Sequence, residues 1–235
     1  MNDIKLILQS LHVKFGSNID LSLEEKSLVM EEIEVKARAI FYFKKVICSK
    51  PDITTTQIHI AQIFEEIFAD ITICLYLGCC SIDNPARILL RRILELGLAT
   101  VYLWDLPHKF WSWNGTVDEH TNDLNFKEML EHVNGKGYIE FINNENSSSL
   151  LSLLDKEEPN KIYRSLSNVI HGKVSSFETT AIDSYNFNKV QHGATLEYIL
   201  RVENLLLALW KKRFPAEFFE LEGTFTTLTR YHYEQ

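Results

Sequence analysis

The sequence predicts an all-α protein built as an antiparallel helical bundle. Glycine and proline are scarce, with 9 and 5 copies in 235 residues, and they separate long segments in which apolar residues recur every three or four positions. Apolar residues make up 46% of the chain, which is enough for one sizeable core. No repeat and no linker divides the sequence, so we expect a single domain over residues 1–235.

The first two long helices are expected before residue 81. Residues 21–50 begin with a capping box, in which Glu25 follows Ser22 by three positions, and they stop just before Pro51. Residues 54–80 then carry isoleucine, phenylalanine and leucine at a regular three-four spacing. Each segment should therefore form a helix with one apolar face.

A third long helix is expected over residues 83–107. Asp83 or Asn84 can cap its start, and Pro85 occupies the first helical position, where a missing N–H costs nothing. Pro107 ends it, because proline cannot continue a helix. Since only a short turn joins it to the preceding helix, the three helices should pack antiparallel as neighbours.

The rest of the chain is less regular. Residues 108–155 are aromatic at one end and rich in glycine, asparagine and serine at the other, which predicts a partly ordered insertion with one short helix near Phe126–Val133. Helical spacing resumes over residues 157–173, and a last long helix is expected over residues 187–214. Threonine and aromatic residues alternate in residues 216–235, which favours an extended C-terminal arm or a partner-binding segment.

Charge and hydropathy narrow the function classes. The formal net charge of −8 argues against a protein that coats nucleic acid with its whole surface, because phosphate binding needs clustered lysine and arginine. A local basic cleft remains compatible with this charge. The sequence contains neither a run of eighteen apolar residues nor a signal peptide, so we expect a soluble, cytoplasmic protein with no membrane contact.

No metal and no cofactor are expected. The four cysteines lie in apolar helical patterns without the spacing of metal ligands, which is typical of reduced core residues. His120 and His132, with the glutamates near them, also lack metal-binding spacing. Glycine-rich phosphate loops and dinucleotide-binding fingerprints do not occur.

Two segments contain residues that could contact RNA. Trp104, Trp111 and Trp113 could stack on bases, although aromatic residues after a helix more often cap the end of a bundle. The basic run at residues 211–213 ends the last long helix, where it suits the helix dipole or could steer phosphates.

A row of polar residues stands out in the segment KIYRSLSNVIHGK, residues 161–173. Because an α-helix advances about 100° per residue, Arg164, Asn168 and His171 lie on one stripe, with apolar residues on the other faces. The helix should end at Gly172, so the dipole favours the charged form of His171 in its last turn. An arginine can hold a phosphate while a histidine moves a proton, but such a row is more often a solvated face or an inter-helix seam.

The residues RSLSNVIH resemble the R-x(4–6)-H motif of the HEPN superfamily of small helical ribonucleases. The segment ARILLRRILELGLATVYL is similar to the central helix of HEPN-like families found near bacterial defence genes. In it Arg87, Arg91 and Glu95 share one face. They form either an ordinary ladder of ion pairs or a face from which the Glu95 carboxylate orients Arg164 or His171.

The resemblance implies a homodimer in which two such motifs form one composite cleft that cuts single-stranded RNA without a metal. It implies catalytic roles for Arg164, His171 and Asn168, with Glu95 as an additional residue. It also implies a toxin or effector of a defence or toxin–antitoxin system, restrained by an antitoxin or another regulatory protein. Because some HEPN members are inactive, the alternative is a non-catalytic bundle that binds a protein partner or a nucleotide signal.

Overall fold

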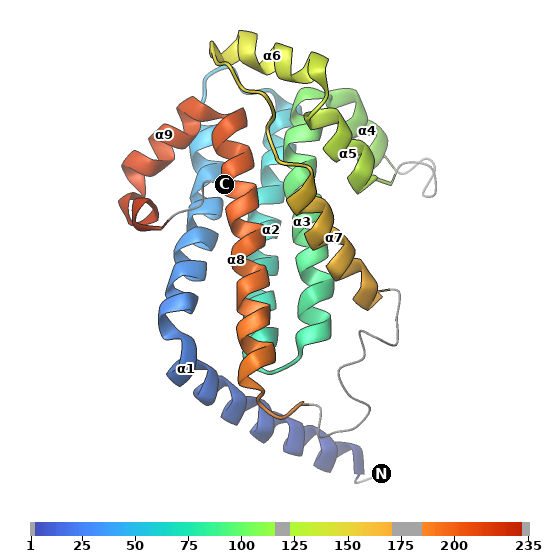
Figure 1. Cartoon of the computed structure of the whole chain (residues 1–235), viewed down its shortest axis with the longest axis vertical. Coiled ribbons are helices and arrows are strands. Elements are labelled where there is room, and N and C mark those ends of the chain that lie inside the picture. Colours follow the sequence, from blue (N-terminus) through green and yellow to red (C-terminus); the bar gives the residue numbers. More distant parts are fainter. Residues whose placement is uncertain (1–2, 116–122, 171–184, 232–235) are drawn as a thin grey trace.

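The computed structural model describes residues 3–115, 123–170 and 185–231, and this part of the chain is all helical, as predicted. Four long helices form the body: α1 (Asp3–Cys48), α2 (Thr55–Cys79), α3 (Asp83–Asp105) and α8 (Lys189–Arg213) (Figure 1). The core lies between them and includes Trp210 of α8, whose ring packs 4.9 Å from that of Phe64 and 6.1 Å from that of Phe43, measured between centroids.

The direction of α8 follows from its contacts with α3. Thr195 donates a hydrogen bond to Asp83 near the start of both helices, and Arg213 binds Asp105 near the end of both. These contacts show that α8 runs parallel to α3, whereas α2, joined to α3 by a short turn, runs antiparallel to it. The long connection from residue 107 to residue 188 makes this return possible.

The predicted start of the first helix at Ser22 is wrong, because α1 already begins at Asp3. The helix instead has a kink at Lys26, where φ is −138° and ψ is 26°. Ser22 is fully buried and its hydroxyl lies 2.8 Å from Nε2 of His192. Ser22, which was predicted to cap the helix, therefore forms a hydrogen bond to another helix. The kink lies one turn further along, at Lys26.

Helices α2 and α3 form where the sequence predicts them, but the predicted cap of α3 is wrong: the helix begins at Asp83, so Pro85 is its third residue and not its first. Thr54 and Gln57 form a complete capping box at the start of α2, with N–H to side-chain oxygen distances of 2.9 and 3.2 Å. At the start of α3 the N-cap is Ile82, and neither Asp83 nor Asn84 holds that position. Pro107 does end this helix, and it occupies the first turn of α4 (Pro107–Asn114).

The insertion at residues 108–155 is more helical than predicted. It contains α5 (Phe126–Val133), with the expected bounds, and also α6 (Lys136–Asn146), which was not predicted. Helix α6 buries Ile139 and Ile142 against the bundle, and the Asn143 side chain donates to the carbonyl and accepts from the N–H of Leu150, which follows the helix.

The prediction of an extended C-terminal arm is wrong through residue 230. This segment forms α9 (Pro215–Thr224) and the short 3-10 helix η3 (Thr226–Arg230). Phe218, Leu221 and Leu228 are buried, and their spacings of three and seven are helical. Residues 232–235 lie outside the described residues.

None of the described helices is both long enough and apolar enough to cross a membrane. The cysteines are all free thiols: Cys74, Cys79 and Cys80 are buried, and Cys48 is half-buried. Burial raises the pKa of each of these thiols above its ordinary value. In the described part of the chain, His, Cys, Asp and Glu side chains form no group of three suited to a metal ion.

Candidate functional site

The predicted polar row lies on α7 (Glu157–Ile170), a helix that packs along α3 (Figure 1). Ile162 and Leu166, one turn apart, are fully buried and define the inner face of α7. Burying two such side chains stabilises the docked helix by roughly 3–6 kcal/mol, so α7 is fixed to the body of the molecule.

One flank of α7 is hydrogen-bonded to α8. The hydroxyl groups of Ser165 and Tyr198 lie 2.7 Å apart. The carboxylate of Glu158 accepts two hydrogen bonds from Arg201, at 3.0 Å from Nε and 2.5 Å from a terminal nitrogen. This flank is therefore a polar seam between two helices.

The other flank of α7 is bonded to α3 through Tyr163. The Tyr163 hydroxyl donates to Glu95 at 3.0 Å and accepts from Arg91 at 2.7 Å, while Arg91 Nε donates to the same carboxylate at 3.1 Å. The Tyr163 ring stacks on Phe126 with centroids 4.0 Å apart and an angle of 1° between the planes. Burial raises the Tyr163 pKa, and the Glu95 carboxylate raises it further.

Glu95 thus binds Arg91 and Tyr163, and within the described residues no hydrogen bond or ion pair joins it to Arg164. The predicted ladder between Arg91 and Glu95 is present. The contact through Tyr163 was not predicted, because it requires α3, α5 and α7 to meet.

Arg164 points away from the bundle. At 100° per residue it lies about 180° from the midpoint between Ile162 and Leu166, and it is exposed. Asn168, one turn later on the same side, is half-buried and has further contacts. His171 lies outside the described residues. We call Arg164 and Asn168 the outer row of α7; Arg164 takes no part in the hydrogen bonds of α7 to α8 and to α3.

Next to Arg164 the surface is hollowed into a groove of about 300 Å³. We call it the α7 groove; it is lined by Lys156, Glu157, Asn160, Lys161 and Arg164. Lys156 and Asn160 were not among the predicted site residues. Lys156, Asn160 and Arg164 follow one another at intervals of four, and this spacing is the sequence signal that could have identified the first two.

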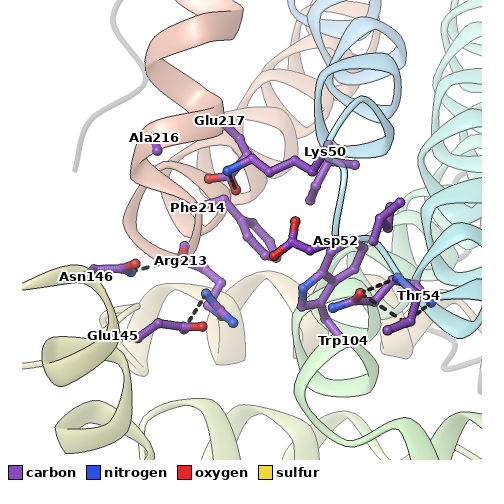
Figure 2. Close-up of a pocket in the computed structure, with 13 residues that line it drawn as sticks. Lys50, Asp52, Thr54, Trp104, Glu145, Asn146, Arg213, Phe214, Ala216 and Glu217 are labelled. Atoms are coloured by element: carbon purple, nitrogen blue, oxygen red, sulfur yellow. Dashed lines mark hydrogen bonds and ion pairs between the residues drawn. The ribbon is translucent and has the colours of Figure 1, made fainter.

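A larger hollow of about 440 Å³ lies near the ends of α3 and α8, beside α6 (Figure 2). Its cations already have partners: Arg213, 5% exposed, binds Asp105 and Glu145, and Lys50 binds Glu217 at 2.5 Å. Because these charges are compensated, the hollow offers no free cation to a phosphate. Arg213, one of the basic residues at 211–213, is thus a structural residue.

The aromatic segment after α3 caps one end of the bundle. Phe110 is buried, and its ring lies 6.2 Å from His59 and 5.3 Å from Trp111, measured between centroids. Trp111 is half exposed and donates a hydrogen bond to Thr56 at 3.2 Å. The capping role that composition favoured is the one observed.

No family model, curated protein or solved structure matches this chain. A functional assignment therefore rests on the chemistry of its own residues.

Proposed function

We propose that the chain is a metal-independent endoribonuclease that cleaves single-stranded RNA at a composite site in a homodimer. The observation that carries the proposal is the position of Arg164: it is exposed on the outer side of a helix that is fixed on its other three sides. Such an arginine is free to bind a phosphate without disturbing the fold.

In the proposed reaction a 2′-hydroxyl of the RNA is the nucleophile. His171 of one copy removes its proton as the oxygen attacks the adjacent phosphorus, and Arg164 stabilises the added negative charge. The 5′-oxygen leaves with a proton from the second His171, so the products are a 2′,3′-cyclic phosphate and a free 5′-hydroxyl. Asn168 positions the reacting groups, and Glu95 acts through Tyr163 as a positioning residue.

The dimer is required because one outer row forms only one wall of a cleft. A second copy would supply the opposite wall and exclude water from the reacting phosphate. The resemblance to HEPN proteins adds that this nuclease serves as a cytoplasmic toxin or defence effector, restrained by an antitoxin or regulatory partner.

The test is to incubate single-stranded RNA with the protein in EDTA. Arg164→Ala and His171→Ala should each lower the cleavage rate by a factor of about 10² to 10⁴, and the wild-type product should end in a 2′,3′-cyclic phosphate. Arg230→Ala, which removes an exposed arginine elsewhere, should cleave like the wild type. The mass in solution should be about twice the 27.3 kDa of one chain.

Equal cleavage by all variants would show a contaminating nuclease and contradict the assignment. An intact RNA with every protein would also contradict it. In that case, loss of nucleotide or protein binding in Arg164→Ala would support the alternative of a non-catalytic binding module.

A further inference from the structure

The α7 groove brings three cations together on an acidic protein. One carboxylate, Glu157, lines it together with Lys156, Lys161 and Arg164, whereas the whole chain has a net charge of −8. Lys161 is paired with Glu157 at 2.9 Å. Lys156 and Arg164 have no hydrogen bond or ion pair through their side chains to other described residues, so their charges are available to a ligand.

Two further carboxylates lie near the groove, and neither forms a hydrogen bond or ion pair with Lys156 or Arg164. Glu158 is bound to Arg201 on the flank that faces α8. Asp155 accepts a hydrogen bond from the backbone N–H of Glu157 at 3.0 Å, which caps the start of α7. Both acids therefore have partners of their own beside the groove.

The polar groups of the groove follow a line. Lys156 stands directly before α7, Asn160 follows by four residues, and Arg164 by four more, so all three fall on one side of the helix. The Asn160 amide donates to the Lys156 carbonyl at 2.8 Å, which fixes this side chain and leaves its oxygen as an acceptor. From Lys156 to Arg164 the line extends about 12 Å at 1.5 Å per residue.

We infer that the α7 groove is a phosphate-binding subsite that holds the RNA strand beside the scissile phosphate. Lys156 binds a neighbouring phosphate as a point charge, Asn160 accepts a hydrogen bond from a ribose hydroxyl, and Arg164 marks the end at which cleavage occurs. The subsite rests on the proposed function for the identity of its ligand. It extends that function by assigning a path to the substrate along α7, from its N-terminus toward Arg164.

The experiment measures binding of a fluorescein-labelled ten-nucleotide single-stranded RNA by anisotropy in EDTA. His171→Ala serves as the background, so that the RNA stays intact. Adding Lys156→Ala should weaken binding about fivefold, and it should reduce the slope of log K against log salt concentration by about 0.7, the value for one lost phosphate contact on a single strand.

Two controls separate a site from a general charge effect. Lys136→Ala removes a lysine with a side chain 92% exposed on α6 and should leave both the affinity and the salt slope unchanged. Asn160→Ala should weaken binding with no change in salt slope, because it removes no charge. Equal losses from Lys136→Ala and Lys156→Ala would overturn the inference, as would displacement of the RNA by an acidic peptide of equal charge.

Cleavage kinetics distinguish this inference from the proposed function. In the otherwise wild-type enzyme, Lys156→Ala should raise KM about fivefold and leave kcat unchanged. The reason is that Lys156 binds its phosphate equally strongly in the ground state and in the transition state. Cleavage with unaltered KM would overturn the subsite and leave the nuclease assignment standing. Binding that depends on Lys156 without any cleavage would overturn the nuclease assignment and leave the subsite standing.

Discussion

Glu203 is a fully buried carboxylic acid in the middle of α8. Neither of its oxygens has a hydrogen-bond partner in the described part of the chain. Burial raises its pKa well above the ordinary value; Lys36, also buried, lowers it and Glu32 raises it. The neutral acid is therefore the form that suits the folded state.

This burial predicts how stability depends on pH. Above about pH 4.3 the unfolded chain releases the Glu203 proton while the folded chain keeps it, so the free energy of unfolding falls as pH rises, by at most about 1.4 kcal/mol per pH unit. The loss continues until the raised pKa of the folded state is reached. Glu203→Gln cannot ionise, so its stability relative to the wild type should increase between pH 5 and pH 8.

Urea unfolding at several pH values measures this difference. Glu197→Gln, an exposed glutamate on the same helix, should track the wild type throughout. A stability difference between Glu203→Gln and the wild type that is independent of pH would contradict the prediction.

At the scale of elements, the closest approach at any glycine of the described residues is that of α3 to α8 at Gly97. A methyl group at this position would overlap the buried Leu206 side chain and place its Cγ 2.9 Å away. The two helices can pack at this distance only because Gly97 has no side chain. The same approach lets Trp210 donate a hydrogen bond at 2.8 Å to Thr100, one turn along α3.

Gly97→Ala should therefore destabilise the protein by about 1–3 kcal/mol, because overpacking outweighs the higher helix propensity of alanine. Gly137→Ala is the matched control: nothing lies within 4 Å of its added methyl group, so it should be neutral or stabilise by up to about 1 kcal/mol. Adding Leu206→Ala should cost less in the Gly97→Ala background than in the wild type. Additive effects of the two substitutions would show that they do not contact each other.

The elements that could be predicted are those whose sequence pattern and tertiary environment agree. Helix α2 has both a capping box and an unbroken apolar face, so local and long-range interactions favour the same structure. Helix α6 begins next to Gly135 and is rich in asparagine; it forms because Ile139 and Ile142 are buried. The C-terminal segment has strand-like composition, but the spacing of its buried residues is helical and decides its structure.

The site was predictable only in part, because some of its contacts depend on helices that are distant in the sequence. The outward direction of Arg164 follows from the helical step once the apolar side of α7 is known. The bond from Tyr163 to Glu95 could not be foreseen, since it joins residues 68 positions apart on two helices. The same holds for Ser165, whose hydroxyl meets that of Tyr198 on α8, 33 positions away.

At the scale of the whole molecule, order should decrease from the body toward the start of α1. The central helices bury their side chains on several faces, whereas Ile4, Leu8 and Val13 are 70%, 61% and 72% exposed. Local opening is easiest where few buried contacts hold a helix. The first three turns of α1 should therefore be the least protected of its backbone.

Hydrogen exchange of the native protein measures this gradient. Amides of residues 90–103 in α3 should exchange slowest, near the rate set by global unfolding, and those of residues 4–13 should exchange fastest among the helices. Equal protection of residues 4–13 would contradict the prediction, and it would show that another chain covers this apolar surface.

The four cysteines, three buried and one half-buried, have a consequence for chemical reactivity. Only the thiolate attacks disulfides and electrophiles, and burial keeps these cysteines protonated at neutral pH by raising their pKa values. The thiols of the folded protein should therefore react with oxidants and disulfides more slowly than those of the unfolded chain.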